Sequence, residues 1–163
     1  MDLALARNKL THVDLSEILS ALPNLERLDL SQNLIVTLVK EPADIFTHAN
    51  LKRLLLSRNL ITDLRQMHRL QFSGLEVLTL FGNYIDIESE QSQERLNFLT
   101  VQFEVIAHVG PSLRELSIEG NPVVEKLLQA EFEGRDDYLD KADHELDNFK
   151  GTIYKQLTVE KLP

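Results

Sequence analysis

Histidines and clustered carboxylates are the residues of this sequence that could do chemistry, by moving protons or by holding a metal ion. Cysteine is absent, so a thiol nucleophile and cysteine ligation of zinc are excluded. Four aspartates lie close together between 136 and 143, but the glycine and closing glutamate of an EF-hand loop are not in register. No HExxH, GxGxxG, GxxxxGK[ST] or GxSxG motif occurs. The sequence therefore predicts no enzyme, no metal site and no cofactor, and assigns no catalytic role to His12, His48, His68, His108 and His144.

Charge and composition argue against several kinds of partner. The formal net charge is −9, which disfavours direct binding to nucleic-acid phosphates and to anionic membranes. Hydrophobic residues make up 43% of the chain, yet no apolar run approaches the ~18–20 residues of a membrane span. The absence of cysteine fits a reducing, intracellular compartment.

A repeat sets the positions of the remaining residues. Leucine accounts for 31 of the 163 residues, and the pattern LxxLxLxxN recurs from the start of the chain to residue 121. Side chains alternate along a strand, so the second and third leucines of each copy point inward and the residues beside them point outward. The asparagine follows where the chain turns, and its amide can bond backbone groups that would otherwise be buried unpaired. We expect a ladder of these amides, formed by Asn8, Asn33, Asn59, Asn83 and Asn121.

These copies resemble the intracellular leucine-rich repeat (LRR) family over nearly all of residues 1–130. The resemblance implies an α/β solenoid with parallel strands on its concave face and helices and turns on its convex face. It divides the chain into a solenoid of about five repeats (1–130), an acidic insert (131–150) and a partial C-terminal cap (151–163). Met1 enters in mid-strand, so we expect either missing preceding residues or another protein covering this edge.

The segments between the strands differ from one another. Apolar spacing predicts a helix over 14–22, and single helical turns or irregular crossings over 42–49 and 63–71. A longer amphipathic helix is predicted over 89–109, ending at Gly110-Pro111, with His108 as a partner of its C-terminal dipole. This helix either covers the convex core or offers its outer face to a partner.

The end of the chain carries a second resemblance. Gly120-Asn121-Pro122-Val123, then Tyr154-Lys155, Val159 and Leu162-Pro163, are similar to the LRR C-terminal cap, with Lys155 in place of the usual arginine. The insert 131–150 holds eight acidic and three basic residues. It either folds back on the cap as a solvated helix or docks on a partner.

The outward strand positions are the predicted binding site, because LRR proteins generally bind partners on the concave face. Arg27 and Arg53 are like-charged neighbours, of which Asp29 can neutralise one and a partner carboxylate or phosphate the other. Leu55, Val77 and Phe81 form an outward apolar cluster beside them. The predicted partner is an acidic, hydrophobic protein segment, and the predicted site comprises Arg27, Asp29, Arg53, Leu55, Val77, Phe81 and Glu115.

The family resemblance implies a non-catalytic scaffold that binds proteins as a subunit of a larger heteromeric assembly. The LRR proteins of ciliary axonemes are the first comparison, because many carry this cap with insertions, and they place the chain in the cytoplasm or cilium. The alternatives are a nuclear ribonucleoprotein LRR subunit, acting in splicing or RNA export, and a regulatory subunit of a phosphatase.

Overall fold

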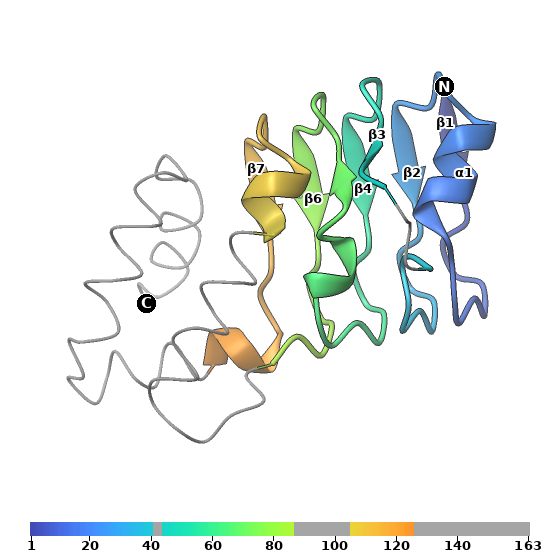
Figure 1. Cartoon of the computed structure of the whole chain (residues 1–163). Coiled ribbons are helices and arrows are strands. Elements are labelled where there is room, and N and C mark those ends of the chain that lie inside the picture. The colour runs from blue at the N-terminus through green and yellow to red at the C-terminus, as the bar shows by residue number, and fades with distance from the viewer. Residues whose placement is uncertain (41–43, 87–104, 126–163) are drawn as a thin grey trace, which may run out of the picture.

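The fold is built around one parallel sheet, seen in a computed structural model that describes residues 1–40, 44–86 and 105–125 (Figure 1). The sheet has five strands in the order β1-β2-β4-β6-β7. Each strand pairs in parallel with its neighbours and is three residues long. The predicted α/β class with parallel strands is confirmed. The bounds are β1 (Asp2–Ala4), β2 (Arg27–Asp29), β4 (Arg53–Leu55), β6 (Val77–Thr79) and β7 (Glu115–Ser117).

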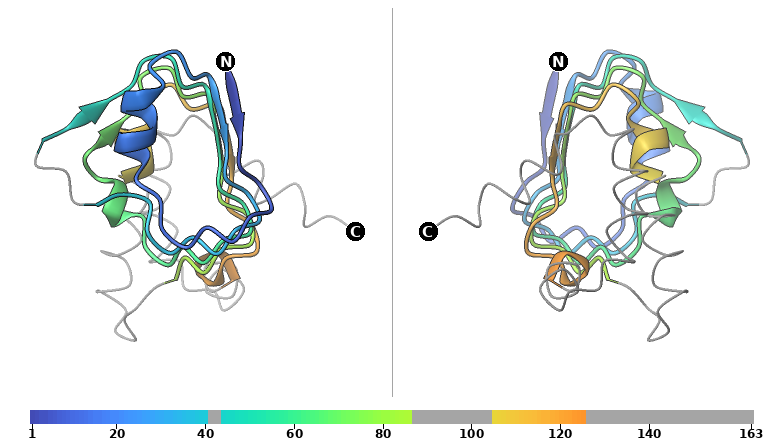
Figure 2. Two further views of the ribbon diagram at one scale, coloured as in Figure 1. Left: turned by 90° about the vertical axis from the view of Figure 1, so that its right-hand side faces the viewer. Right: turned by 90° about the vertical axis from the view of Figure 1, so that its left-hand side faces the viewer.

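Between successive strands the chain returns along the opposite side of a shared interior. Seen end-on, these turns of the chain superpose, with the sheet on one side and the return segments on the other (Figure 2). We call each strand with its return segment a coil. Among the described residues, helices are few: α1 (Leu15–Ala21), the 3-10 helix η1 (Arg65–Met67) and the helical residues 105–109 and 122–125.

Two of the return segments contain strands that the sequence analysis did not predict. β3 (Phe46–Thr47) and β5 (Leu70–Gln71) form a second, two-stranded parallel sheet. The prediction of helical turns or irregular crossings over 42–49 and 63–71 is correct only for η1. Each of these strands is two residues long and forms its hydrogen bonds with the neighbouring coil. A segment this short shows no alternation in the sequence from which a strand could be predicted.

The helix α1 forms where the sequence analysis placed it. Asp14 caps its N-terminus by accepting hydrogen bonds from the backbone N–H groups of Ser16 and Glu17, while Leu15 and Leu19 are buried. Burial alone would raise the pKa of Asp14. Hydrogen bonds from the Ser16 hydroxyl and from three backbone N–H groups outweigh burial and lower it. One of these N–H groups belongs to Lys40, so the cap also ties the first coil to the second.

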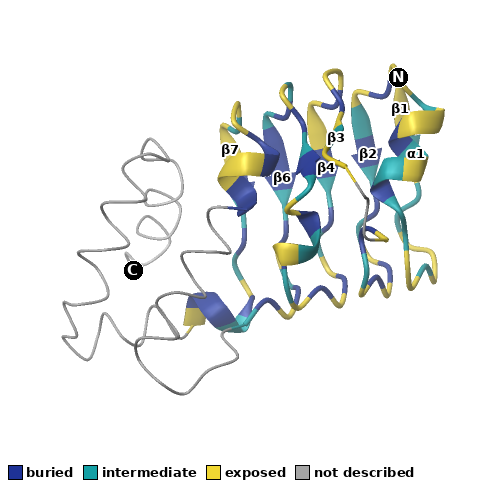
Figure 3. Cartoon of the chain, viewed as in Figure 1, coloured by how far each residue is buried: buried dark blue, intermediate teal, exposed yellow. Residues whose placement is uncertain are grey.

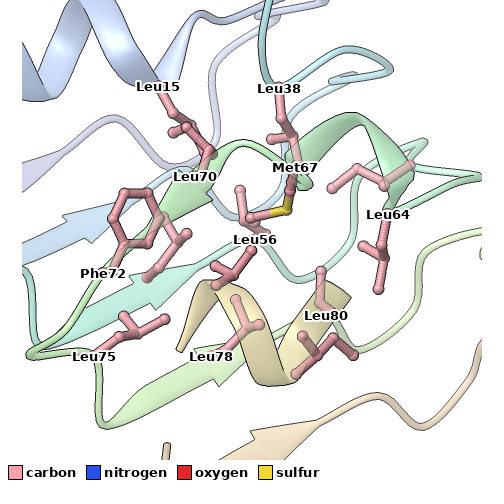
Figure 4. Packing of buried hydrophobic residues seen from close by; sticks show 14 of the residues in the cluster. Leu15, Leu38, Leu56, Leu64, Met67, Leu70, Phe72, Leu75, Leu78 and Leu80 are labelled. Atoms are coloured by element: carbon pink, nitrogen blue, oxygen red, sulfur yellow. The ribbon is translucent and has the colours of Figure 1, made fainter. Parts of the chain in front are cut away.

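The interior is filled by the inward leucines of all five coils. Leu28, Leu54 and Leu78 lie opposite one another in the register of the sheet and have almost no exposed surface. The return segments contribute the other wall, where Phe72 and Met67 pack with leucines of the strands (Figure 4). Exposed residues gather on the outside, as on the outer face of α1 (Figure 3). Burial of each such side chain stabilises the fold by about 1.5–3 kcal/mol, and one coil alone cannot provide it.

The five asparagines form a ladder of hydrogen bonds below the sheet. Asn59 donates to the carbonyls of Leu30 and Leu56 at 3.0 Å and accepts from the N–H of Ile35 at 3.1 Å. The same three kinds of bond recur for Asn33, Asn83 and Asn121, all of which are buried. Asn8 is exposed and donates only to carbonyls of its own turn. The ladder thus links each coil to the next. Asn8, its first member, forms the fewest hydrogen bonds and contributes least to stability.

A left-handed backbone residue precedes every ladder asparagine. The φ angles of these residues lie between 56° and 66°, a region that favours glycine. Two coils supply glycine there and three do not; the residues are Arg7, Gln32, Arg58, Gly82 and Gly120.

Several predictions fall outside the described residues. They concern residues 89–104 of the long helix, the insert 131–150, the cap segment 151–163 and His144. Of the range predicted to be a long helix, residues 105–109 are described and are helical, and the N–H of Gly110 donates to the carbonyl of Ile106 at their end. Among the described residues, no helix has the length and apolarity that crossing a membrane requires.

Candidate functional site

The outer face of the five-stranded sheet brings six of the seven predicted site residues together in register, and Phe81 follows two residues after the end of β6. Arg27 lies opposite Arg53, and Asp29 lies opposite Leu55. Val77 continues the row of the arginines, and Glu115 ends it on β7. We call this surface the outer sheet face. Its residues are the outward positions that the repeat predicted.

Arg27 is neutralised within the chain. Its guanidinium donates to the Asp29 carboxylate at 3.2 Å and lies 4.0 Å from Asp2. Asp29 in turn accepts a hydrogen bond from the N–H of Ser31, which fixes the carboxylate in place. The prediction that Asp29 neutralises one of the two arginines is confirmed.

Arg53 differs from Arg27 in its surroundings. It is exposed, and within the described part of the chain no carboxylate lies within ion-pair distance of it. It borders an open polar cleft of about 420 Å³, which is also lined by Asp2, Glu26, Arg27 and Lys52. Like charges on directly opposed strand positions repel, so Arg53 is the guanidinium on this face that a carboxylate from outside would stabilise.

The third cation of the cleft, Lys52, is paired as Arg27 is. Lys52 donates to Glu26 at 2.8 Å. This hydrogen bond and the charge of Lys52 lower the pKa of Glu26, and the same contact raises the pKa of Lys52. An incoming anion therefore meets one free cation, Arg53, beside two that have carboxylate partners.

The apolar part of the site is smaller than predicted. Val77 is only 8% exposed, so it is not a member of an exposed cluster. Its short side chain lies between Arg53 and Glu115 on the neighbouring strands, and longer side chains flank it on both sides. Leu55 is half-buried and Phe81 is exposed, and these two form the apolar surface that remains.

Sequence reasoning missed a contact at the lower end of this face. The guanidinium of Arg58 lies over the ring of Phe81, 5.6 Å from its centroid, in a cation–π arrangement. The repeat could have predicted this contact. Arg58 occupies the repeat position that Gly82 occupies in the next coil, directly after Phe81, and the backbone N–H of Arg58 donates to the carbonyl of Phe81. The ring of Phe81 remains 38% exposed beside this contact.

The far end of the face is acidic. Glu115 is exposed on β7, and the Ser117 hydroxyl donates to Glu119 at 2.6 Å. The outer sheet face therefore runs from a free arginine on β4, across Leu55 and Phe81, to carboxylates on β7.

The histidines do not contribute to this face. His48 is buried, its Nδ1 accepts from the N–H of Leu51 at 3.1 Å, and its Nε2 lies 3.3 Å from the carbonyl of Leu22. These partners assign the neutral tautomer with the proton on Nε2, and a structural role. Among the residues described, no group of three or more histidine, aspartate or glutamate side chains is placed to hold a metal ion.

Comparison of the sequence with protein-family models gave no match, and comparison with curated proteins gave none either.

Proposed function

We propose that the chain is a leucine-rich-repeat solenoid that acts as a non-catalytic, protein-binding subunit of a larger assembly. Three features of the described residues support the solenoid: five in-register parallel strands, one repeat copy per coil, and the buried amide ladder that joins neighbouring coils. Such an architecture fixes its inward residues by packing and leaves its outward strand residues free to recognise a partner.

The outer sheet face binds an acidic, apolar segment of a partner protein. A carboxylate of that segment pairs with Arg53 in bidentate geometry, and neighbouring apolar side chains cover Leu55 and Phe81. The observations that carry this proposal lie on one face: Arg53 is exposed and has no carboxylate partner among the described residues, and the exposed ring of Phe81, over which Arg58 lies, follows further along the same face. Arginines and aromatic rings dominate binding energy at protein interfaces.

The test compares two variants of the outer sheet face with a matched control. Arg53→Glu and Phe81→Glu reverse the charge and the polarity of the two anchors, whereas Ile45→Glu changes an exposed apolar residue of a return segment. Partners are first purified with the full chain as bait, identified by mass spectrometry, and then titrated as pure proteins. We expect each outer-face variant to weaken binding at least tenfold and the control to bind normally. Full binding by both variants, with unchanged circular dichroism, would place the site elsewhere.

The identity of the purified partners tests the proposed setting. We propose an intracellular, heteromeric assembly, with the ciliary axoneme as the first candidate because of the resemblance of the repeats and cap. Recovery of tubulin and dyneins supports that setting. Recovery of splicing or export factors supports the nuclear ribonucleoprotein alternative, and recovery of a phosphatase catalytic subunit supports the regulatory one.

A further inference from the structure

A column of apolar side chains lies exposed along the turns below the sheet. In three successive coils the residue directly after the ladder asparagine is Leu34, Leu60 or Tyr84, and these are 45%, 36% and 56% exposed. The next residue in each of these coils is an isoleucine with no exposed surface. The core is therefore complete without the three exposed side chains.

The three residues lie side by side on neighbouring coils. The N–H of Leu60 donates to the carbonyl of Ile35, and the N–H of Tyr84 donates to the carbonyl of Ile61, both at 2.9 Å. Adjacent coils are about 4.8 Å apart, so the column is continuous and spans about 10 Å from Leu34 to Tyr84. We call these three residues the turn stripe. The first coil has Lys9 at the same position, which shows that the fold itself does not require an apolar residue there.

The border of the turn stripe nearest the sheet is basic. Arg58 occupies the left-handed position before the asparagine in the middle coil of the stripe, whereas Arg7 and Lys9 lie in the first coil, beyond the end of the stripe at Leu34. No described carboxylate lies within ion-pair distance of any of these three cations. The opposite border carries Val36, Thr62 and Asp86, so the positive charge is confined to one side.

We propose that the turn stripe binds an amphipathic helix of the partner protein whose flank toward Arg7 and Arg58 is acidic. Apolar residues at i, i+3 or i+4, and i+7 of a helix span about 10.5 Å, which matches the length of the stripe. Glutamates or aspartates beside them meet the unpaired arginines. This inference rests on the proposed function, because it extends the same binding surface from Phe81, across Arg58, onto the turns.

The experiment uses three synthetic helical peptides as probes. The first has leucines at the matching spacing and a glutamate flank, the second replaces the glutamates by lysines, and the third scatters the leucines around the helix. The chain contains no cysteine, so Thr62→Cys in the full chain places a single environment-sensitive fluorophore beside the stripe. We expect the first peptide to bind at least tenfold more tightly than the other two. Equal binding of the lysine peptide, or of the scattered peptide, would overturn the proposal.

Variants of the stripe locate the binding. Leu60→Ser combined with Tyr84→Ser should weaken binding of the first peptide at least tenfold. Ile45→Ser, at an exposed apolar position directly before β3 in a return segment, should not change that binding. Circular dichroism and thermal unfolding establish that the variants are folded. Unchanged binding by the double variant would overturn the proposal.

Titrations with a purified native partner test the two proposed binding surfaces independently. If Arg53→Glu weakens binding and the stripe variants do not, the inference about the turn stripe is wrong and the outer sheet face stands. If only the stripe variants weaken binding, the outer sheet face is wrong and the turn stripe stands.

Discussion

Removal of one central ladder amide tests how the coils are held together. Asn59→Ala deletes an amide that bonds to three backbone groups of two coils. The carbonyls of Leu30 and Leu56 keep a second bond, from Asn33 and Asn83 respectively. The N–H of Ile35 has no such reserve among the described residues, and the substitution leaves it buried and unpaired.

The magnitude follows from this inventory. A buried N–H left without a partner costs about 1–3 kcal/mol, and each of the two shared bonds contributes about 0.5–1.5 kcal/mol. We expect Asn59→Ala to lower the free energy of unfolding by about 2–6 kcal/mol, a large share of the 5–15 kcal/mol typical of a domain. Asn8→Ala is the matched control, because Asn8 is exposed and bonds only within its own turn. Its cost should stay below about 1 kcal/mol.

Urea unfolding followed by circular dichroism measures both variants against the parent chain. A lower midpoint at unchanged slope reports a loss of stability, and a changed slope reports a break in cooperativity between coils. Equal losses of unfolding free energy for Asn59→Ala and Asn8→Ala, or a loss under about 1 kcal/mol for Asn59→Ala, would refute the proposed contribution of the ladder to stability.

Four further variants probe local geometry. Gly74→Ala should cost about 1–3 kcal/mol in urea unfolding, because its Cβ would lie 2.3 Å from the backbone oxygen of Ala49, which cannot move aside freely. Gly82→Ala should cost about 1 kcal/mol by forcing a side chain into φ 62°, and Gln32→Gly should be neutral or stabilising because it relieves φ 56°. Asp14→Ala should cost about 0.5–2 kcal/mol at pH 7. The folded-state pKa of Asp14 lies below its ordinary value of 3.8, so this difference should persist above that pH and vanish as the pH falls through the lowered pKa.

Each of these has an outcome that contradicts it. Ser73→Ala, at an exposed neighbour of Gly74, provides the baseline, and a Gly74→Ala variant as stable as this control would show that the backbone yields. If Gln32→Gly destabilises the chain as much as Gly82→Ala does, the left-handed φ angle does not determine which residue is preferred at this position. A stability difference between Asp14→Ala and the parent that is the same at pH 2 and pH 7 would remove the cap's charge from the explanation.

The repeat predicted the sheet well because side chains alternate between the two faces of a strand, so the inward leucines determine which residues face outward. With Leu28 and Leu30 turned inward, Arg27 and Asp29 must face outward, and a common period brings Arg53 opposite Arg27. The Arg27–Asp29 pair follows from the same geometry. Prediction here needed only the period of the leucines.

Prediction was weaker where tertiary contacts decide. The β3–β5 pair depends on which coil happens to lie beside which return segment, and His48 is buried by partners more than twenty residues away or across a turn. Val77 was predicted to be exposed because its position faces outward, but direction alone does not set exposure when long neighbours flank a short side chain.

The separation of inward and outward residues determines how binding experiments on this chain should be interpreted. Within the described residues, Arg53, Leu60 and Tyr84 are exposed and their side chains form no hydrogen bond or ion pair, so their substitution removes little that stabilises the coils. Arg58 is different, because it holds the ring of Phe81 and also adopts a left-handed backbone. Its replacement by glycine relieves φ while releasing the ring, which changes stability and binding in opposite directions. A loss of binding by Arg58→Gly at equal or greater stability therefore separates a recognition role for this residue from a structural one.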